Sequence, residues 1–430
     1  MTFNFDNPLI RERAYSGQFG LERETLRVDA SGALAQTAHP FGEDESITRD
    51  FCENQVEIIT PPEESPAAVV RSLGALHARA VRQLLPRNDG AESLWPFSNP
   101  PRISGEDEIP IARFEGNLTP KMTYRQYLAQ KYGKRKMLFC GIHCNFSFDD
   151  ELLKAGFEES GEEDFARYKN AVYLSLAGRL AEYGWLIVYL TAASSVSDSS
   201  LFDDASAGGQ YASARCGDSG YWNPFVPVFD YTDIEAYTES IWRYIKEGAI
   251  VSPSELYYPI RLKPKGENRL DHLRDNGVNH IELRMLDVNP LTPEGIFEKD
   301  IAFIQLLILY LMSSEDGAPD ENAQKIAVRN FQQAARYDDG AVTVLNPDVP
   351  GSAKGIKEAA AEILSDMRVF FVSLSASEEV FDVLAYQENK LLDEQNRYAV
   401  KIREIYGDNF TEKGLALAKQ YAEKVMTQAI

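Results

Sequence analysis

The most constraining feature of this sequence is a strict alternation of apolar and polar side chains in residues 141–148, GIHCNFSF. A β-strand projects successive side chains to opposite faces, so this segment predicts a strand with one apolar and one polar face. His143 begins the polar face. Residues 280–287 alternate in the same way and place Glu282 and Arg284 on one side. The sequence therefore predicts a sheet with one face in the core and one face available for polar chemistry.

The remaining patterns predict how this sheet is completed and covered. Further strands are expected in GLERETLRV, residues 20–28, and in QVEIIT, residues 55–60. Apolar residues at helical spacing predict helices over 67–85, 124–133, 163–190, 234–246 and most of the chain from about 296 onward. Residues 86–120 predict a long loop region, and residues 191–223, which are small, polar and rich in Gly and Ser, predict a mobile covering loop.

Charge and hydropathy limit the classes of partner. The formal net charge of -22 argues against nucleic-acid binding, because phosphate backbones are held by clustered Lys and Arg. The longest apolar stretch, residues 301–312, is about half a bilayer span and predicts a buried helix. An acidic chain that binds an anion needs divalent cations or a local Arg cluster to screen the repulsion.

The cysteines and the first residues predict the compartment. The 4 cysteines form no CxxC pair and no Cys/His spacing suited to zinc, so a disulfide framework is not expected. The N-terminus lacks a charged start followed by an apolar run, which argues against a secretory signal. A cytoplasmic location follows by elimination, and a length of 430 residues is compatible with a single catalytic body.

Acidic residues recur at spacings that matter for metal binding. Glu22 and Glu24 leave the same face of a strand, Glu57 interrupts an apolar run, and Asp50 lies shortly before it. If these acids converge with Glu282, carboxylates about 4 Å apart repel by about 4 kcal/mol at an effective dielectric near 20. Such a cluster needs cations, and oxygen ligands suit Mg2+ or Mn2+, which bridge nucleotide phosphates. The structural alternative is that each acid is a solvated residue paired with a nearby arginine.

Glycine-rich nucleotide signatures are missing from the sequence. Neither GxxxxGK[ST] nor a GxGxxG after a strand occurs, and HExxH is absent. If ATP binds, we expect it to bind through a sheet face and metal ions.

At these residues the sequence resembles the glutamate-cysteine ligase family, which is related in fold to glutamine synthetase. The matching segments are GLERETLRV, TRDFCENQVEIITPP, LWPFSNP, YRQYLAQKYG, GIHCNFS, RCGDSGYWN, ELYYPIR and IELRMLDVNPLTPEG, in family order from residue 20 to about 295. The resemblance implies an α+β fold in which a large, mainly antiparallel β-sheet forms a funnel-like active site flanked by α-helices. It also implies one catalytic domain over 1–430, with its motifs in 20–295 and a mainly helical part in 296–430.

The resemblance assigns roles to residues that match family positions. The metal-binding or metal-adjacent positions are Glu22, Glu24, Asp50, Glu57, His143 and Glu282. Arg284 matches a residue that contacts the nucleotide phosphates, and Arg125 an arginine beside the reacting carboxylate, so both are catalytic candidates. The substrate-binding candidates are the aromatic residues Phe51, Tyr124, Tyr221 and Tyr257, which match the cysteine pocket, and Arg125, Arg215 and Arg261, of which the last two are candidate anchors for amino-acid carboxylates.

The implied activity is ATP-dependent ligation of the glutamate γ-carboxylate to the amine of cysteine through an acyl phosphate, with Mg2+ or Mn2+ as cofactor. The product, γ-glutamylcysteine, belongs to the first step of glutathione biosynthesis. Two residues depart from the family pattern, Cys144 and Met285, and both are expected to repack the core without touching the site. No room remains for a second, ATP-grasp domain, so glutathione synthesis itself is not expected.

Two alternatives stay open on the sequence alone. A γ-glutamyl ligase of the same fold could use another amine, which altered aromatic residues in the acceptor pocket would favour. A nonenzymatic regulatory protein that kept the fold would be expected to lose members of the acidic set, whereas all six metal positions carry ligand-type residues. Glutamate, cysteine and ATP are the expected partners, and the sequence leaves the oligomeric state undetermined.

Overall fold

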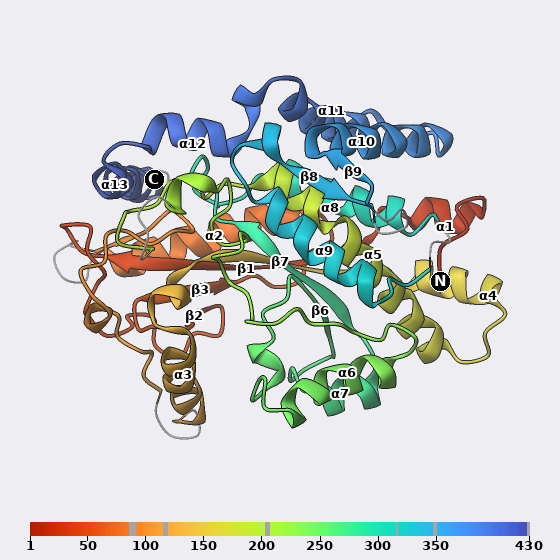
Figure 1. Cartoon of the computed structure of the whole chain (residues 1–430), viewed down its shortest axis with the longest axis horizontal. Helices are drawn as coiled ribbons and strands as arrows, with labels where there is room; N and C mark the ends of the chain where they lie inside the picture. The colour runs from red at the N-terminus through yellow and green to blue at the C-terminus, as the bar shows by residue number, and fades with distance from the viewer. Residues whose placement is uncertain (86–91, 115–118, 203–206, 315–316, 347–350, 428–430) are drawn as a thin grey trace.

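The computed structural model describes residues 1–85, 92–114, 119–202, 207–314, 317–346 and 351–427 (Figure 1). Its strands are β1 Gly17–Val28, β2 Ile47–Arg49, β3 Gln55–Ile59, β4 Ser93–Leu94, β5 Gly141–Phe148, β6 Ile260–Lys263, β7 His280–Asp287, β8 Thr343–Leu345 and β9 Ala353–Gly355. Its α-helices are α1 Pro8–Arg13, α2 Pro66–Leu84, α3 Thr119–Tyr132, α4 Asp150–Ser160, α5 Phe165–Thr191, α6 Ile234–Lys246, α7 Leu270–Asn276, α8 Glu298–Leu311, α9 Glu321–Ala334, α10 Ile356–Ser373, α11 Glu378–Leu392, α12 Tyr398–Tyr406 and α13 Phe410–Thr427.

One sheet organises the molecule, and its neighbouring strands pair antiparallel in the order β2-β3-β1-β5-β7-β6. The short strand β4 extends it by pairing with the end of β1, and β8 and β9 form a separate hairpin. This arrangement confirms the predicted α+β class with a mainly antiparallel sheet. The predicted strands at 55–60, 141–148 and 280–287 are present with nearly the same bounds.

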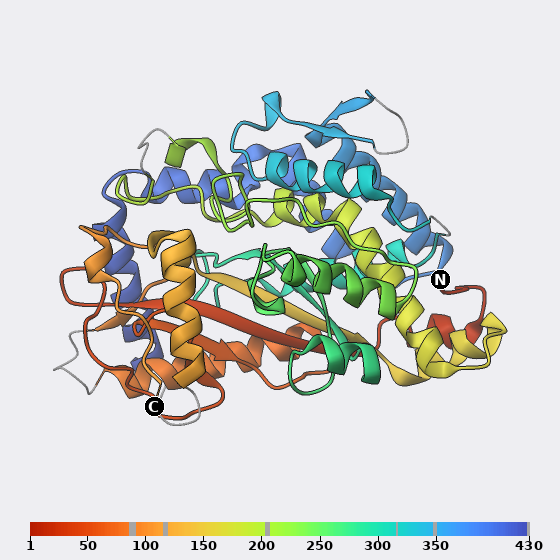
Figure 2. The same cartoon turned by 60° about the horizontal axis from the view of Figure 1, so that its bottom comes forward.

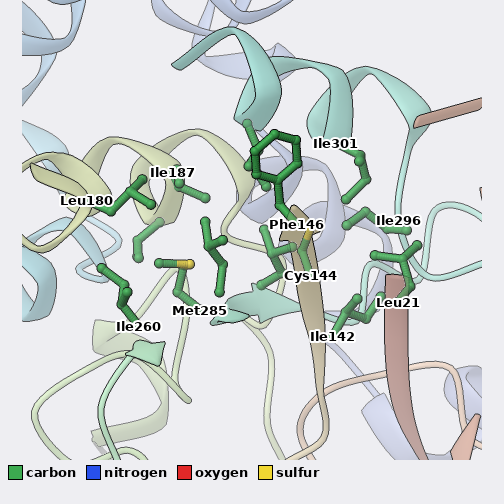
Figure 3. Packing of buried hydrophobic residues seen from close by; sticks show 14 of the residues in the cluster. Leu21, Ile142, Cys144, Phe146, Leu180, Ile187, Ile260, Met285, Ile296 and Ile301 are labelled. Atoms are coloured by element: carbon green, nitrogen blue, oxygen red, sulfur yellow. The ribbon is translucent and has the colours of Figure 1, made fainter. Parts of the chain in front are cut away.

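One face of the sheet, here called the core face, packs against α2, α5 and α8. Figure 3 shows this packing, with Leu21, Cys144 and Met285 from the strands meeting Leu180 and Ile301 from α5 and α8. The side chains of Cys144 and Met285 are buried. The expectation that these two departures lie in the core is therefore confirmed, but Met285 also lines a small cavity beside Tyr221 and Arg284, so it is not separate from the site region. A continuous hydrophobic cluster runs from Phe3 to Val425.

Several helices begin where a side chain satisfies the free backbone N–H groups of the first turn. The capping residues are Ser65, Asp149, Asp164, Asp233 and Asp320. These caps agree with the predicted helices at 67–85, 163–190 and 234–246. Helix α3 was predicted from residue 124 but begins at Thr119, because Pro120 is tolerated in a first turn and the sequence from there remains compatible with a helix.

The segment 191–223 is irregular as predicted, but its described part is held firmly. The buried carboxylate of Asp287 accepts hydrogen bonds from Ala193 N at 2.9 Å, Ser194 Oγ at 2.9 Å and Ser213 Oγ at 3.0 Å. Residues 203–206 lie outside the described part of the chain. The prediction of a mobile loop is therefore wrong for the residues around these contacts, because a buried acid on β7 holds the start of the segment and Ser213 together.

Helix α3 stands apart from the other helices. Figures 1 and 2 show it on the opposite side of the sheet from the C-terminal helices α10 and α11.

No helix among the described residues is both long enough and apolar enough to cross a bilayer.

Candidate active site

Cross-strand pairing gathers the predicted polar residues on the second face of the sheet, here called the polar face. Directly opposed residues of antiparallel strands project to the same side. The opposed pairs are Glu24 with Glu57, Glu22 with His143, Asn145 with Glu282, and Arg261 with Glu282. Segments that are far apart in the sequence thus contribute to one row of polar side chains across the middle of the sheet.

A β-bulge adjusts this row where β5 meets β7. Ile142 pairs with Leu286 and Cys144 with Leu283, so two residues of β7, Arg284 and Met285, oppose His143 alone. Bulges redirect side chains and are common next to active sites. Here Arg284 Nη1 lies 3.0 Å from Glu282 Oε1 and 3.3 Å from His143 Nδ1.

Glu22, His143 and Glu282 form a group that can hold a metal ion. One ligand atom from each lies within 4.8 Å of the others. His143 Nδ1 is 3.2 Å from Glu22 Oε2 and 3.7 Å from Glu282 Oε1. Glu282 is buried, and its Oε2 atom accepts no hydrogen bond in the described structure. A buried carboxylate oxygen normally accepts a hydrogen bond, and Lys263 Nζ at 3.6 Å does not supply one. This free acceptor, together with two carboxylates and an imidazole, fits Mg2+ or Mn2+.

The pKa values of the two carboxylates in this group are lowered. Burial raises the pKa of Glu22, but the hydrogen bond with His143 and the positive charges of His143 and Lys263 together lower it below its usual value. Burial likewise opposes ionisation of Glu282, yet the positive charges of Arg284 and Lys263 hold its pKa well below the usual range. Both side chains are therefore ionised at neutral pH, which is the state that binds a cation.

The remaining acids, Glu24, Asp50 and Glu57, lie next to this group, and the pKa values of Glu24 and Glu57 are raised. Burial raises the pKa of Glu24, and the negative charge of Asp50 adds to the effect. Burial also raises the pKa of Glu57 well above its usual range, with further repulsion from Asp50 and from the glutamates of β1. Carboxylates that resist ionisation in this way are the ones that a bound cation stabilises most.

Four cationic side chains border the acids. Arg125 on α3 donates to the backbone oxygen of Asp50 and places Nη2 3.8 Å from Asp50 Oδ1. Lys263 Nζ lies 3.6 Å from Glu282 Oε2. The other two cationic side chains are Arg284 and Arg215. Arg215 Nη2 lies 3.5 Å from His143 Nε2. The polar face therefore combines ligands for a cation with donors for phosphate or carboxylate oxygens.

Arg215 reaches this position because Gly141 leaves room for it. A Cβ at Gly141 would lie 2.3 Å from Arg215 Cζ, so no other residue fits against the guanidinium there. Arg215 Nη1 also donates to the backbone oxygen of Arg284 at 2.5 Å. The arginine is thus packed directly on β5 at the edge of the acid row.

Three of the predicted aromatic residues come together beside the acids. The rings of Tyr221 and Tyr257 have centroids 4.2 Å apart. Burial raises the pKa of Tyr257, and the neighbouring Tyr221 and Tyr124 add to the shift. Burial also raises the pKa of Tyr221, followed by the charges of Asp50 and Glu24, so this tyrosine lies close to the acids. Tyr221 and Tyr257 line a small cavity of about 30 Å³ together with Arg215 and Arg284.

Phe51 and Arg261 contact other parts of the protein, and their predicted substrate contacts stay predictions. The ring of Phe51 is buried in the core, and within the described structure it is not among the rings that pair closely with Tyr221 or Tyr257. Arg261 lies near Arg284, since burial and then the charge of Arg284 lower its pKa to about 10. Its guanidinium donates to the backbone oxygens of Leu256 and Ser254. In this structure Arg261 therefore supports the turn before β6.

Two residues of the polar face escaped the sequence-based assignment. Asn145 Nδ2 donates to Glu22 Oε1 at 2.9 Å and thereby orients this carboxylate. Lys263 approaches Glu282 from β6. The sequence signal that could have found both residues is the two-residue spacing of side chains on one face of a strand. Asn145 lies two residues after His143, and Lys263 lies two residues after Arg261.

Comparison with known sequences identifies a family. The sequence model of the family described as glutamate-cysteine ligase matches residues 9–226 and 224–334. The glutathione biosynthesis bifunctional protein GshAB of Listeria monocytogenes is 34% identical over 441 residues, covering 97% of this chain and 56% of the relative. The protein of the same name from Clostridium perfringens is 32% identical over 423 residues, covering 94% of this chain and 54% of the relative. The chain thus spans about half the length of these curated relatives.

Comparison with solved structures agrees with the fold. A bifunctional glutathione synthetase from Pasteurella multocida superposes with a TM-score of 0.82 at 26% identity, covering 97% of this chain and 54% of that one. A glutamate-cysteine ligase from Francisella tularensis, solved in complex with AMP, superposes with a TM-score of 0.84 at 24% identity, covering 95% and 89%. At that identity the second likeness supports the fold alone.

Proposed function

Because the chain belongs to the glutamate-cysteine ligase family, we propose that it uses ATP to join the γ-carboxylate of glutamate to the amine of cysteine. The products are γ-glutamylcysteine, ADP and phosphate. The observation that carries this proposal is the polar face itself, where Glu22, His143 and Glu282 lie within 4.8 Å of one another beside Arg284. A nonenzymatic protein would not need ionised, buried carboxylates at such spacing.

In the proposed site, Glu22, His143 and Glu282 would hold Mg2+ or Mn2+, with Glu24, Asp50 and Glu57 as neighbouring ligands. The bound cation would neutralise charge on the triphosphate of ATP and align it for transfer. Asn145 keeps the Glu22 carboxylate pointing toward His143. Burial of Glu282 keeps competing water away from Oε2, which accepts no hydrogen bond in the described structure.

The first chemical step transfers the terminal phosphoryl group. A γ-carboxylate oxygen of glutamate attacks the γ-phosphorus of ATP, the bond to the bridging oxygen breaks, and ADP leaves with that electron pair. Arg284, fixed between Glu282 and His143, donates to phosphate oxygens on which negative charge develops. Arg125 is held at Asp50 on the other side of the row, where it can donate to the reacting carboxylate.

The second step forms the amide. The cysteine amine attacks the acyl carbon, phosphate leaves, and the amine loses one proton. Tyr124, Tyr221 and Tyr257 form the proposed acceptor pocket beside the acids, and Arg215 is the candidate anchor for an amino-acid carboxylate. Apolar ring surface favours the soft thiol over a hydroxyl, although one such difference gives only about 1 to 3 kcal/mol.

Two further features belong to the proposal. We infer a cytoplasmic location, supported by the buried free thiols of Cys52, Cys140, Cys144 and Cys216. We also infer that residues 1–430 act as one catalytic body, supported by the continuous hydrophobic cluster from Phe3 to Val425.

The test is to incubate the purified protein with ATP, Mg2+, glutamate and single amines, then to follow ADP release and product mass. Cysteine, serine, 2-aminobutyrate and methylamine are the informative amines. We expect cysteine to give the highest kcat/KM and a product of the mass of γ-glutamylcysteine. Faster ligation of another amine would overturn the cysteine assignment, and the absence of ADP release with every amine would overturn the ligase assignment.

A further inference from the structure

A buried carboxylate outside the acid row joins the segments that carry the acceptor tyrosines. Glu255 has a fully buried side chain, and its Oε1 accepts hydrogen bonds from Lys131 Nζ at 2.5 Å, Tyr132 OH at 2.8 Å and Tyr127 OH at 3.2 Å. Its Oε2 accepts from Val251 N at 2.7 Å. All three side-chain donors lie on α3, so this single carboxylate attaches the helix to the turn before Tyr257.

Apart from its hydrogen bonds to Glu255, helix α3 makes few fully buried contacts. Leu128 is its only buried residue in the described structure, and its main neighbouring element is the turn Arg135–Leu138. Figure 2 shows the helix standing in front of the sheet, away from the packed helical layers. Tyr124, Tyr127, Ala129 and Tyr132 are partly buried and pack against the hydrophobic cluster. Because only Leu128 is fully buried, this packing is limited, and the hydrogen bonds and charge at Glu255 add to it in placing the helix.

The same helix carries two residues of the proposed site. Tyr124 stacks on Tyr127 with ring centroids 6.4 Å apart, one helical turn from the residues that contact Glu255. Arg125 contacts Asp50 at the acid row. A displacement of α3 would therefore move Tyr124 and Arg125 together.

The other two tyrosines are connected to the same point. Asn223 Nδ2 donates to the backbone oxygen of Glu255 at 2.9 Å and to Tyr132 OH at 3.2 Å, and its Oδ1 accepts from Tyr257 N at 2.7 Å. Tyr221 precedes Asn223 by two residues. Three separate segments, each with one tyrosine of the acceptor pocket, thus meet at Glu255.

We propose that Glu255 is a positioning residue for the acceptor pocket, which it assembles by docking α3 through Lys131, Tyr127 and Tyr132. This inference rests on the proposed function. Glu255 itself touches none of the reacting atoms and acts through Tyr124, Tyr257 and Arg125. Correct docking closes the pocket around the amine acceptor and keeps water from the acyl phosphate.

The test compares Glu255→Gln and Lys131→Met with a matched pair on another helix. Lys246 and Glu239 on α6 form an exposed ion pair, so Glu239→Gln and Lys246→Met are the controls. For each variant, KM for cysteine, KM for ATP and the ratio of ADP released to γ-glutamylcysteine formed are measured, with thermal unfolding as a check on folding. A loosened pocket lets water take the acyl group, which returns glutamate and phosphate and releases ADP without product.

We expect KM for cysteine to rise about tenfold in both test variants, because a hydrogen bond to a charged buried group is lost. KM for ATP should change little, and the ADP-to-product ratio should rise, whereas both control variants should match the wild type. The double variant Glu255→Gln/Lys131→Met should be less impaired than the two single effects combined, since both remove one interaction. Equal rises in both KM values, or an unchanged KM for cysteine in folded Lys131→Met, would overturn the inference. A wild-type protein that makes no γ-glutamylcysteine would instead overturn the proposed function.

Discussion

Buried charges on the two faces of the sheet have different kinds of neighbours. On the core face, Arg27 forms an ion pair with Glu92 at 2.6 Å and donates to Thr37 and to the backbone oxygen of Glu53. On the polar face, burial raises the pKa values of Glu24 and Glu57, neighbouring acids add to the shift, and Glu282 keeps an oxygen without a hydrogen bond. Both sets of residues alternate along strands of the same sheet.

This difference separates a structural charge from a functional one. A buried charge with a protein partner is already compensated, and removing its partner destabilises the fold. On the polar face, neighbouring cationic side chains compensate the clustered acids only in part, so a bound cation stabilises them further and the fold tolerates them for the sake of binding. Substitutions on the two faces should therefore affect different measurements.

The largest expected effect is on the polar face. Glu22→Gln and Glu282→Gln should each lower ADP release by about a thousandfold, because the site loses a charged ligand for the cation that supports transfer. The measurement is steady-state ADP release with glutamate and cysteine, and circular dichroism shows that the variants remain folded. Full activity in both folded variants would remove the metal assignment.

A smaller effect, on stability alone, is expected on the core face. Arg27→Met should lower the free energy of unfolding by about 3 kcal/mol, because Glu92 is then buried without its guanidinium partner. Urea denaturation measures the change, and kcat of the folded fraction should stay at the wild-type value. Lys154→Met, which breaks an exposed pair with Glu151, is the control and should leave the free energy of unfolding at the wild-type value. A lower kcat in folded Arg27→Met would show that this charge on the core face also affects catalysis, which would contradict the proposed difference between the two faces.

The smallest effect concerns pH and again lies on the core face. Burial holds the pKa of His77 well below its usual value, and the nearby charge of Arg23 adds to this. The unfolded chain binds a proton at this histidine below about pH 6.5 while the folded chain does not, so stability falls as pH decreases below that value. His77 alone lowers the free energy of unfolding by about 1 kcal/mol when the pH decreases from 6.5 to 5.5. In His77→Leu the dependence of unfolding free energy on pH between 6.5 and 5.5 should be shallower, and an identical slope would show that His77 does not titrate differently in the folded state.

Local patterns were sufficient for the elements that present the site. The alternation in residues 141–148 and 280–287 predicted β5 and β7 and the side to which His143 and Glu282 project. Long-range contacts were not predictable in the same way. The anchoring of segment 191–223 depends on Asp287, a residue far along the chain, so a Gly- and Ser-rich composition was mistaken for mobility.

The helix that carries Tyr124 and Arg125 illustrates the same limit. Its composition indicated a helix, yet nothing in the segment itself showed that Glu255 would hold it against the sheet. Lys263 was missed for a related reason, because its role appears only when β6 lies beside β7.

The sequence by itself determined which side chains share a face, because the two-residue period of a strand is a local property of the backbone. Only the tertiary structure decided which faces meet, how β5 and β7 are shifted at the bulge, and which acids lie close enough to share a cation. Those outcomes depend on hydrogen-bonded register between distant segments, and register is set by the packing of the whole core.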